Sequence, residues 1–172
     1  FNLTLFYGAK ALDSFGDTLE ISLNKSAGAR LAGQSFINAE AGAASRLGGE
    51  GFENTLVRAE VKYYDVLGQR FWRGLSLGKH TLAVSWYVDY GIDLDRDRQF
   101  LVGADNALRG YDVASFAGDK RTVLNVEDRA HLIDDAFRMV SIGSALFADV
   151  GGATNEKLGD LFTSQLYADV GV

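Results

Sequence analysis

The chain of 172 residues contains no cysteine, no proline and only two histidines. The absence of cysteine excludes disulfide scaffolds, zinc–thiolate and iron–sulfur sites and thiol nucleophiles, and two histidines leave little room for a metal centre. The chain also lacks a basic stripe: its formal charge is -6, whereas a nucleic-acid binder concentrates lysine and arginine on one surface. We therefore expect no cofactor, no metal, no nucleic-acid partner and no catalysis.

The sequence also lacks the roughly 18 to 20 consecutive apolar residues that a membrane-spanning helix needs. A strand of a membrane barrel needs only about 9 to 11 alternating residues, so a membrane location stays open. Hydrophobic residues make up 47% of the chain and aromatic residues 12%, which excludes a disordered tail. The chain starts at Phe1 without an initiator methionine or a basic leader, so we expect a piece of a longer protein.

Apolar and polar residues alternate over most of the chain, which is the pattern of half-buried strands. In residues 55–65, Val57 and Val61 fall on one face and Glu60 on the other. The same alternation predicts seven more strands, within residues 2–7, 18–24, 35–43, 80–90, 121–129, 137–150 and 161–172. The connections are rich in Gly, Asp and Asn, which supply the turns of hairpins. The chain is therefore predicted to be all-β, an antiparallel up-and-down meander of about eight strands.

Two architectures fit such a meander: a soluble sandwich or small barrel, and a transmembrane barrel with its apolar face toward lipid. Alternation alone does not separate them. The lack of proline, the long strands and the aromatic residues near predicted strand ends favour the membrane barrel, because aromatic girdles sit at membrane interfaces. These aromatic residues are Trp72, Tyr90 and Phe162.

One connection, at about residues 92–120, is far longer than the roughly 2 to 5 residues of an ordinary hairpin loop. Long loops of this kind are functional or disordered. This one contains six large apolar residues, too many for a solvated tether, so we expect it to dock onto the rest of the protein. The six are Phe100, Leu101, Val102, Leu108, Tyr111 and Phe116.

Four short segments in and after this loop follow one another in the order of a known family pattern. They are GADNALRGY at 103–111, FAGD at 116–119, VLNVEDR at 123–129 and LFADVG at 146–151. On the predicted loop–strand–turn–strand frame they resemble the bacterial surface-antigen outer-membrane β-barrel superfamily, which contains BamA, TamA and the two-partner-secretion transporters. The specific likeness covers about residues 100–151, and the earlier segments match only in strand pattern.

The resemblance implies that residues 1–172 form one partial outer-membrane barrel domain, covering about strands 7 to 14 of sixteen. The long loop would be the sixth extracellular loop, folded back into the barrel lumen. Its tip would consist of Leu108, Arg109, Gly110 and Tyr111. The acidic partners on the barrel wall would be Asp149 on strand 13 and Glu127 on strand 12.

The residues themselves are compatible with this assignment. Asp149 and Glu127 fall on the polar faces of their predicted strands. A guanidinium in a partly desolvated lumen needs acidic partners, and its planar fork binds a carboxylate through two bonds, which lysine cannot reproduce. We predict an Arg109–Asp149 contact shorter than about 4 Å with Glu127 nearby. Gly110 would let the backbone turn and approach the wall closely.

The function that the resemblance implies is the insertion or secretion of client proteins at the bacterial outer membrane, without catalysis. The partners would be membrane lipid, client outer-membrane or secreted proteins, and periplasmic domains upstream in the same parent chain. Two alternatives stay open. One is a barrel anchor fused to an upstream enzyme such as a patatin-like lipase, and the other is a soluble β-sandwich binding module.

Two other segments need an interpretation. The spacing of Asp93, Asp95 and Asp97 matches the first three acidic positions of a calcium-binding loop. Arg98, however, occupies the position where such a loop requires glycine. We therefore interpret the three residues as solvated loop charges. Residues 69–79 lie where a barrel has a short turn, yet they are longer than such turns. The sequence assigns residues 69–79 no role.

Overall fold

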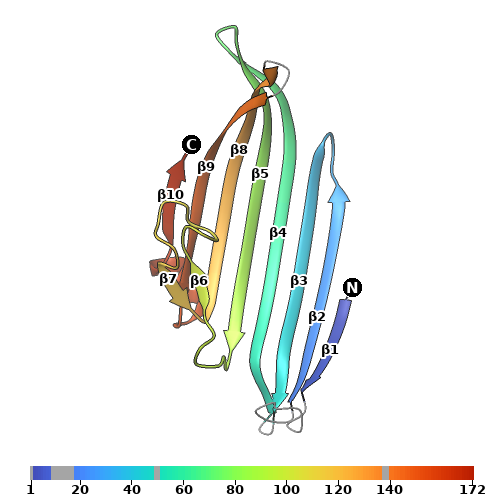
Figure 1. Ribbon diagram of the computed structural model, residues 1–172, viewed down its shortest axis with the longest axis vertical. Coiled ribbons are helices and arrows are strands. Elements are labelled where there is room, and N and C mark those ends of the chain that lie inside the picture. The colour runs from blue at the N-terminus through green and yellow to red at the C-terminus, as the bar shows by residue number, and fades with distance from the viewer. Residues whose placement is uncertain (1, 9–17, 49–50, 137–139) are drawn as a thin grey trace.

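The dominant feature of the computed structural model, which describes residues 2–8, 18–48, 51–136 and 140–172, is one antiparallel sheet (Figure 1). Its eight strands follow one another in the order β1-β2-β3-β4-β5-β8-β9-β10. They are β1 (Asn2–Gly8), β2 (Thr18–Arg30), β3 (Ser35–Gly48), β4 (Gly51–Trp72), β5 (Leu75–Ile92), β8 (Lys120–Ala136), β9 (Val140–Thr154) and β10 (Tyr167–Gly171). The prediction of an all-β, eight-stranded antiparallel meander is confirmed. β1 and β10 form the two edges of the sheet, so the described sheet is not closed.

The pairing register sorts the alternating residues onto two faces. Arg58 lies opposite Asp89 and Asp89 opposite Arg121, which puts the charged residues of neighbouring strands on one face, the polar face. Trp86 lies opposite Leu124 on the other, the apolar face. Large side chains of the apolar face are exposed on every part of the sheet, among them Leu5, Leu23, Val57, Trp86, Leu124, Leu146 and Val170. The described residues place no second layer over this face.

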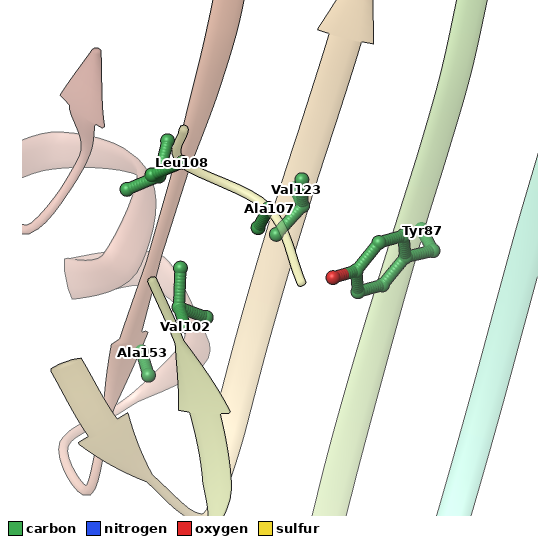
Figure 2. Close-up of a cluster of buried hydrophobic side chains, with 6 residues drawn as sticks. All are labelled: Tyr87, Val102, Ala107, Leu108, Val123 and Ala153. Carbon is green, nitrogen blue, oxygen red and sulfur yellow. The ribbon is translucent and has the colours of Figure 1, made fainter. Parts of the chain in front are cut away.

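The long loop supplies the second layer on the polar face. It contains a small two-stranded sheet, β6 (Phe100–Val102) and β7 (Phe116–Gly118), which lies over β8 and β9 (Figure 1). Between loop and sheet lies a buried apolar cluster, shown in Figure 2 and composed of Tyr87, Val102, Ala107, Leu108, Val123 and Ala153. Val102 and Leu108 are completely buried. The loop therefore docks, as predicted from its apolar content, and the core of the molecule sits beneath it rather than between two large sheets.

The last predicted strand, residues 161–172, is wrong in its first half. Residues Leu158–Ser164 form a short helix, α1, and only Tyr167–Gly171 pair with β9. Leu161 is completely buried against Gly152, whereas Phe162 on the next helical position is 48% exposed. Burial of one leucine from a helical turn replaces the expected alternation of Phe162 and Leu166. Within the described residues, no helix is long and apolar enough to cross a membrane.

Residues 69–79 belong to the sheet. β4 and β5 continue through this segment and join at Arg73 and Gly74, whose φ angles of 48° and 81° are those of a tight hairpin turn. The register shifts once beside Gly68 and once after Arg70, so the ribbon contains two irregularities. The segment is thus the end of a long hairpin, and Figure 1 shows it projecting at the end of the sheet away from β6 and β7.

Candidate functional site

The tip of the long loop is folded by its own backbone. The carbonyl of Gly103 accepts hydrogen bonds from the N–H groups of Ala107 and Leu108 at 2.9 and 3.0 Å, and the side chain of Asn106 closes the turn on Gly103 N–H at 3.1 Å. A Cβ at Gly103 would lie 2.4 Å from the carbonyl oxygen of Asp112, so only glycine fits there. This compact turn buries Leu108 and leaves the next residue, Arg109, directed at the sheet.

Arg109 binds two carboxylates on the polar face. Its Nε lies 3.0 Å from Asp149 Oδ2 and its Nη2 3.3 Å from Asp149 Oδ1, a two-bond contact, and Nη2 also lies 2.9 Å from Glu127 Oε2. The predicted contact below about 4 Å is present, and Glu127 lies beside it. The guanidinium carbon sits 3.9 Å from the ring centre of Phe147, which adds a cation–π interaction.

Asp149 is the buried centre of this group. Its side chain has no exposed surface, and Asn125 donates Nδ2 to its Oδ1 at 2.8 Å as well as to the carbonyl of Ala107 at 2.9 Å. A buried carboxylate without partners is strongly unfavourable, and Arg109 and Asn125 supply the partners that Asp149 needs. Asn125 therefore ties the loop backbone and the acidic residue to the same strand.

Gly110 and Tyr111 reach one strand further, to β10. The N–H of Gly110 donates to Asp169 Oδ2 at 2.9 Å, and a Cβ at Gly110 would lie 2.9 Å from the Cβ of Asp169. The close approach predicted for Gly110 is therefore present, and its partner is Asp169. The Tyr111 hydroxyl donates to the carbonyl of Ala168 at 3.3 Å. Sequence reasoning did not identify Asp169, although it lies directly opposite Asp149 in the sheet.

A second charged cluster holds the other arm of the loop, and the sequence analysis missed it. Arg121 donates Nε to Asp89 Oδ2 at 2.6 Å and Nη1 to the carbonyl of Leu101 in β6 at 2.7 Å. Asp89 is 3% exposed, and the more distant Arg58 is its second cation at 3.7 Å. The Arg121 guanidinium also lies 5.2 Å from the ring centres of Tyr87 and of Phe100. One arginine thus joins β5, β8 and β6.

The signal for this cluster was present in the sequence. Asp89 and Arg121 flank the long loop on the polar faces of the two predicted strands that the loop connects. Antiparallel pairing through a loop brings such flanking residues opposite each other, and Asp89 does lie opposite Arg121. The sequence therefore places the two residues near each other, but a loop of this length does not fix the register that pairs them.

The acidic run at the start of the loop is also not simply solvated. Arg46 at the end of β3 forms a two-bond contact with Asp95, with Nη1–Oδ2 2.9 Å and Nη2–Oδ1 2.7 Å, and a further ion pair with Glu53 at 3.2 Å. The hydrogen bonds from Arg46 lower the pKa of the Asp95 carboxyl below its ordinary value of 3.8. Asp95 thus stays partly solvated, with 37% of its side chain exposed, and is in addition held by a basic residue of another strand.

All three contact groups have the same effect, which is to hold the long loop on the sheet. Arg109, Arg121 and Arg46 each fasten a different part of the loop to a different strand. The part of the chain that the structure describes contains no group of three or more His, Cys, Asp or Glu side chains that could hold a metal ion. What this arrangement offers is a loop held in a fixed place on the polar face.

Comparison with known proteins adds no relative: no protein-family model matches the chain, and no curated protein matches it. The superfamily resemblance therefore rests on the motif order around residues 100–151 together with the geometry described above.

Proposed function

We propose that this chain forms part of an outer-membrane β-barrel of the protein assembly and translocation superfamily. In this proposal the eight strands of the large sheet supply about strands 7 to 14 of a sixteen-stranded barrel, the polar face lines its lumen, and the apolar face meets lipid. The protein inserts or secretes client proteins at the bacterial outer membrane and carries out no catalysis.

The observation that supports this most is the position of Arg109. The long loop lies on the polar face of the sheet, and its arginine reaches Asp149 and Glu127, the two residues that the resemblance implies as its partners. Burying a carboxylate such as Asp149 is costly, so an ion pair built on it is not expected in a loop that only connects two strands. Its use is to brace the inside of a wide barrel.

The apolar face supports a lipid contact. On β5 the apolar row from Leu82 to Tyr90 is about 27 Å long at about 3.4 Å per residue. At a strand tilt of about 40° this is about 21 Å along the membrane normal, within the roughly 25 Å apolar band of membrane barrels. The indole N–H of Trp86 on this face donates to Thr122 at 3.0 Å, so it is satisfied without water. The row ends where His80 pairs with Asp128 at 2.8 Å.

The mechanism that follows is a bracing mechanism. The three arginine contacts fix the loop across β3, β5, β8 and β9, so the loop narrows the lumen and stiffens that side of the wall. A client then passes through the remaining space, or adds a strand at an edge where the wall is less well held. Weakening the brace should impair the handling of clients before it impairs insertion of the barrel itself.

The test replaces Arg109 in the parent protein. Arg109→Ala should leave the barrel inserted in the outer membrane, judged by its resistance to detergent unfolding without heat, while client insertion or secretion falls clearly in a complementation assay. Arg109→Lys should recover little, because lysine lacks the two-bond fork. Arg129→Ala, which removes an arginine that binds only Glu127 among the described carboxylates, is the matched control. Undiminished client handling by Arg109→Ala would refute the proposal.

A further inference from the structure

The end of the sheet opposite the long loop has a feature that the bracing mechanism does not use. Residues 66–78, here called the β4–β5 tip, extend beyond the paired parts of both neighbouring strands, although β8 itself continues to Ala136. The last pair of β3 with β4 is Ser35 with Asp65, and the last pair of β5 with β8 is Lys79 with His131. The tip is a free two-stranded ribbon, and Figure 1 shows it projecting past the rest of the sheet.

The tip is apolar and exposed. Phe71 is 67%, Trp72 59% and Leu75 64% exposed. An isolated two-stranded ribbon is at best marginally stable in water, and large exposed aromatic side chains mark a surface that contacts something else. Its base is nevertheless fixed, because Gly78 packs so closely on β8 that a Cβ there would lie 2.1 Å from the carbonyl oxygen of His131. The tip is thus held in place while its aromatic end is uncovered.

The charge of the tip points to an anionic partner. Residues 66–78 contain Arg70 and Arg73 and no acidic residue, in a chain whose formal charge is -6. Within the described part of the chain neither arginine has a carboxylate partner, and Arg73 lies 5.0 Å from the ring centre of Trp72. By contrast, Arg46, Arg58 and Arg121 on the sheet and Arg109 in the long loop all have carboxylate partners.

The depth of the β4–β5 tip relative to the membrane favours a lipid partner over a protein partner. The Trp72–Leu75 pair is four residue pairs beyond Gly68–His80, or about 13 Å along the strand and about 10 Å along the membrane normal for a tilt of about 40°. His80 ends the apolar row of β5, and the headgroup layer outside the hydrocarbon is about 5 to 8 Å thick. On β9 the apolar face continues to Ile142 and Val140, both exposed. Arg70 and Phe71 therefore fall at headgroup depth.

We propose that the β4–β5 tip binds the phosphate headgroups of anionic phospholipids, with Arg70 and Arg73 on the phosphates and with Phe71 and Trp72 packed among the headgroups. Tryptophan and arginine together at this depth are the usual composition of a membrane interface. Each arginine near an anionic surface favours binding about fivefold. This inference rests on the proposed membrane span, and the test separates the two.

The chain has two tryptophans, Trp72 in the tip and Trp86 on the apolar face, so each can be isolated by replacing the other with phenylalanine. The full chain is inserted in vesicles that contain either brominated phosphatidylglycerol or brominated phosphatidylcholine with the same acyl chains. Bromine quenches the fluorescence of nearby indoles, and the quenching by the two lipids is compared. In W86F, Trp72 should be quenched several-fold more by brominated phosphatidylglycerol at equal mole fraction. Adding Arg70→Gln and Arg73→Gln should bring the ratio to about one. Arg96→Gln with Arg98→Gln, the same change of charge in the long loop, is the control and should keep the preference.

The outcomes are distinguishable. In W72F, quenching of Trp86 by both lipids reports the span itself, and a Trp86 that neither lipid quenches overturns the proposed membrane location. If Trp86 is quenched and Trp72 is open to aqueous iodide, the span stands and the tip faces water or a protein, which overturns the lipid proposal. Equal quenching of Trp72 by both lipids also overturns it, because the arginines then select no anion.

Discussion

Arg109 and Asp149 are 40 residues apart in the sequence and meet through two nitrogen–oxygen contacts of 3.0 and 3.3 Å. The carboxylate is completely buried, while the guanidinium side chain keeps 38% of its surface exposed. The pair is therefore asymmetric: the loss of the arginine leaves a buried charge, and the loss of the acid leaves a cation that can turn to water or to Glu127. This asymmetry sets the first prediction.

Arg109→Ala should destabilise the protein more than Asp149→Ala does, and the two changes should not add. We expect a coupling free energy of about 1–3 kcal/mol from the double-mutant cycle, measured by urea unfolding of the protein. The control cycle pairs Asp149→Ala with Arg129→Ala, which binds Glu127 and not Asp149, and its coupling should be close to zero. Additive effects in the first cycle would show that the contact contributes no stability.

Arg121→Gln should weaken the second anchor of the loop. Asp89 is almost completely buried and would keep only Arg58 at 3.7 Å, so we expect a loss of about 2–4 kcal/mol and faster proteolysis around Leu101. Arg58→Gln is the matched change, and it should cost less than about 1 kcal/mol because Arg58 is half exposed and more distant. An equal effect of both variants would contradict the assigned role of Arg121.

Gly110→Ala should displace the tip of the loop from β10. The added Cβ would lie 2.9 Å from Asp169 Cβ, so the loop or the strand must shift, at a cost of about 1–3 kcal/mol. Gly159→Ala is the control, because no atom lies within 4 Å of a Cβ there and the residue is in α1, where alanine is favoured. A Gly110→Ala protein as stable as Gly159→Ala would mean that the tip does not need this contact.

The start of the loop should loosen in acid. The pKa of Asp95 is lowered by its hydrogen bonds from Arg46, so the contact contributes stability above pH 3.8 and loses it as the pH falls through the lowered pKa. A spin label at Asp97→Cys should therefore stay immobile from neutral pH to about pH 4 and become mobile below that. In Arg46→Gln the label should be mobile at every pH. A transition near pH 6 instead would point to a histidine and not to Asp95.

The sequence predicted the sheet well because one physical signal, the period of two, runs through Val57, Val61, Trp86 and their neighbours. The strand prediction was wrong where the conformation of a residue is determined by contacts that leave no period of two in the sequence. Leu161 is buried from a helical turn, so residues 158–164 form α1 instead of a strand. Gly68 and Gly78 resemble loop glycines, yet both have positive φ at irregular places within one long hairpin.

The residues of the candidate site were likewise predicted only in part. Arg109, Asp149 and Glu127 were found because their spacing follows a motif. Asp169 and the Arg121–Asp89 pair have no motif, and their contacts depend on which residues the register puts opposite each other. That register becomes visible only when both strands and the loop between them are placed.

In the proposed function, the apolar face meets lipid while the polar face lines a water-filled lumen. Because the chain has no cysteine, single cysteines can be introduced along β5 from Leu82 to Tyr90 and spin-labelled in the membrane-inserted protein. Accessibility to oxygen, which partitions into lipid, should peak at Leu82, Val84, Trp86, Val88 and Tyr90, and accessibility to a water-soluble nickel complex should be lowest there. Labels on both faces that are equally accessible to the nickel complex would contradict the account.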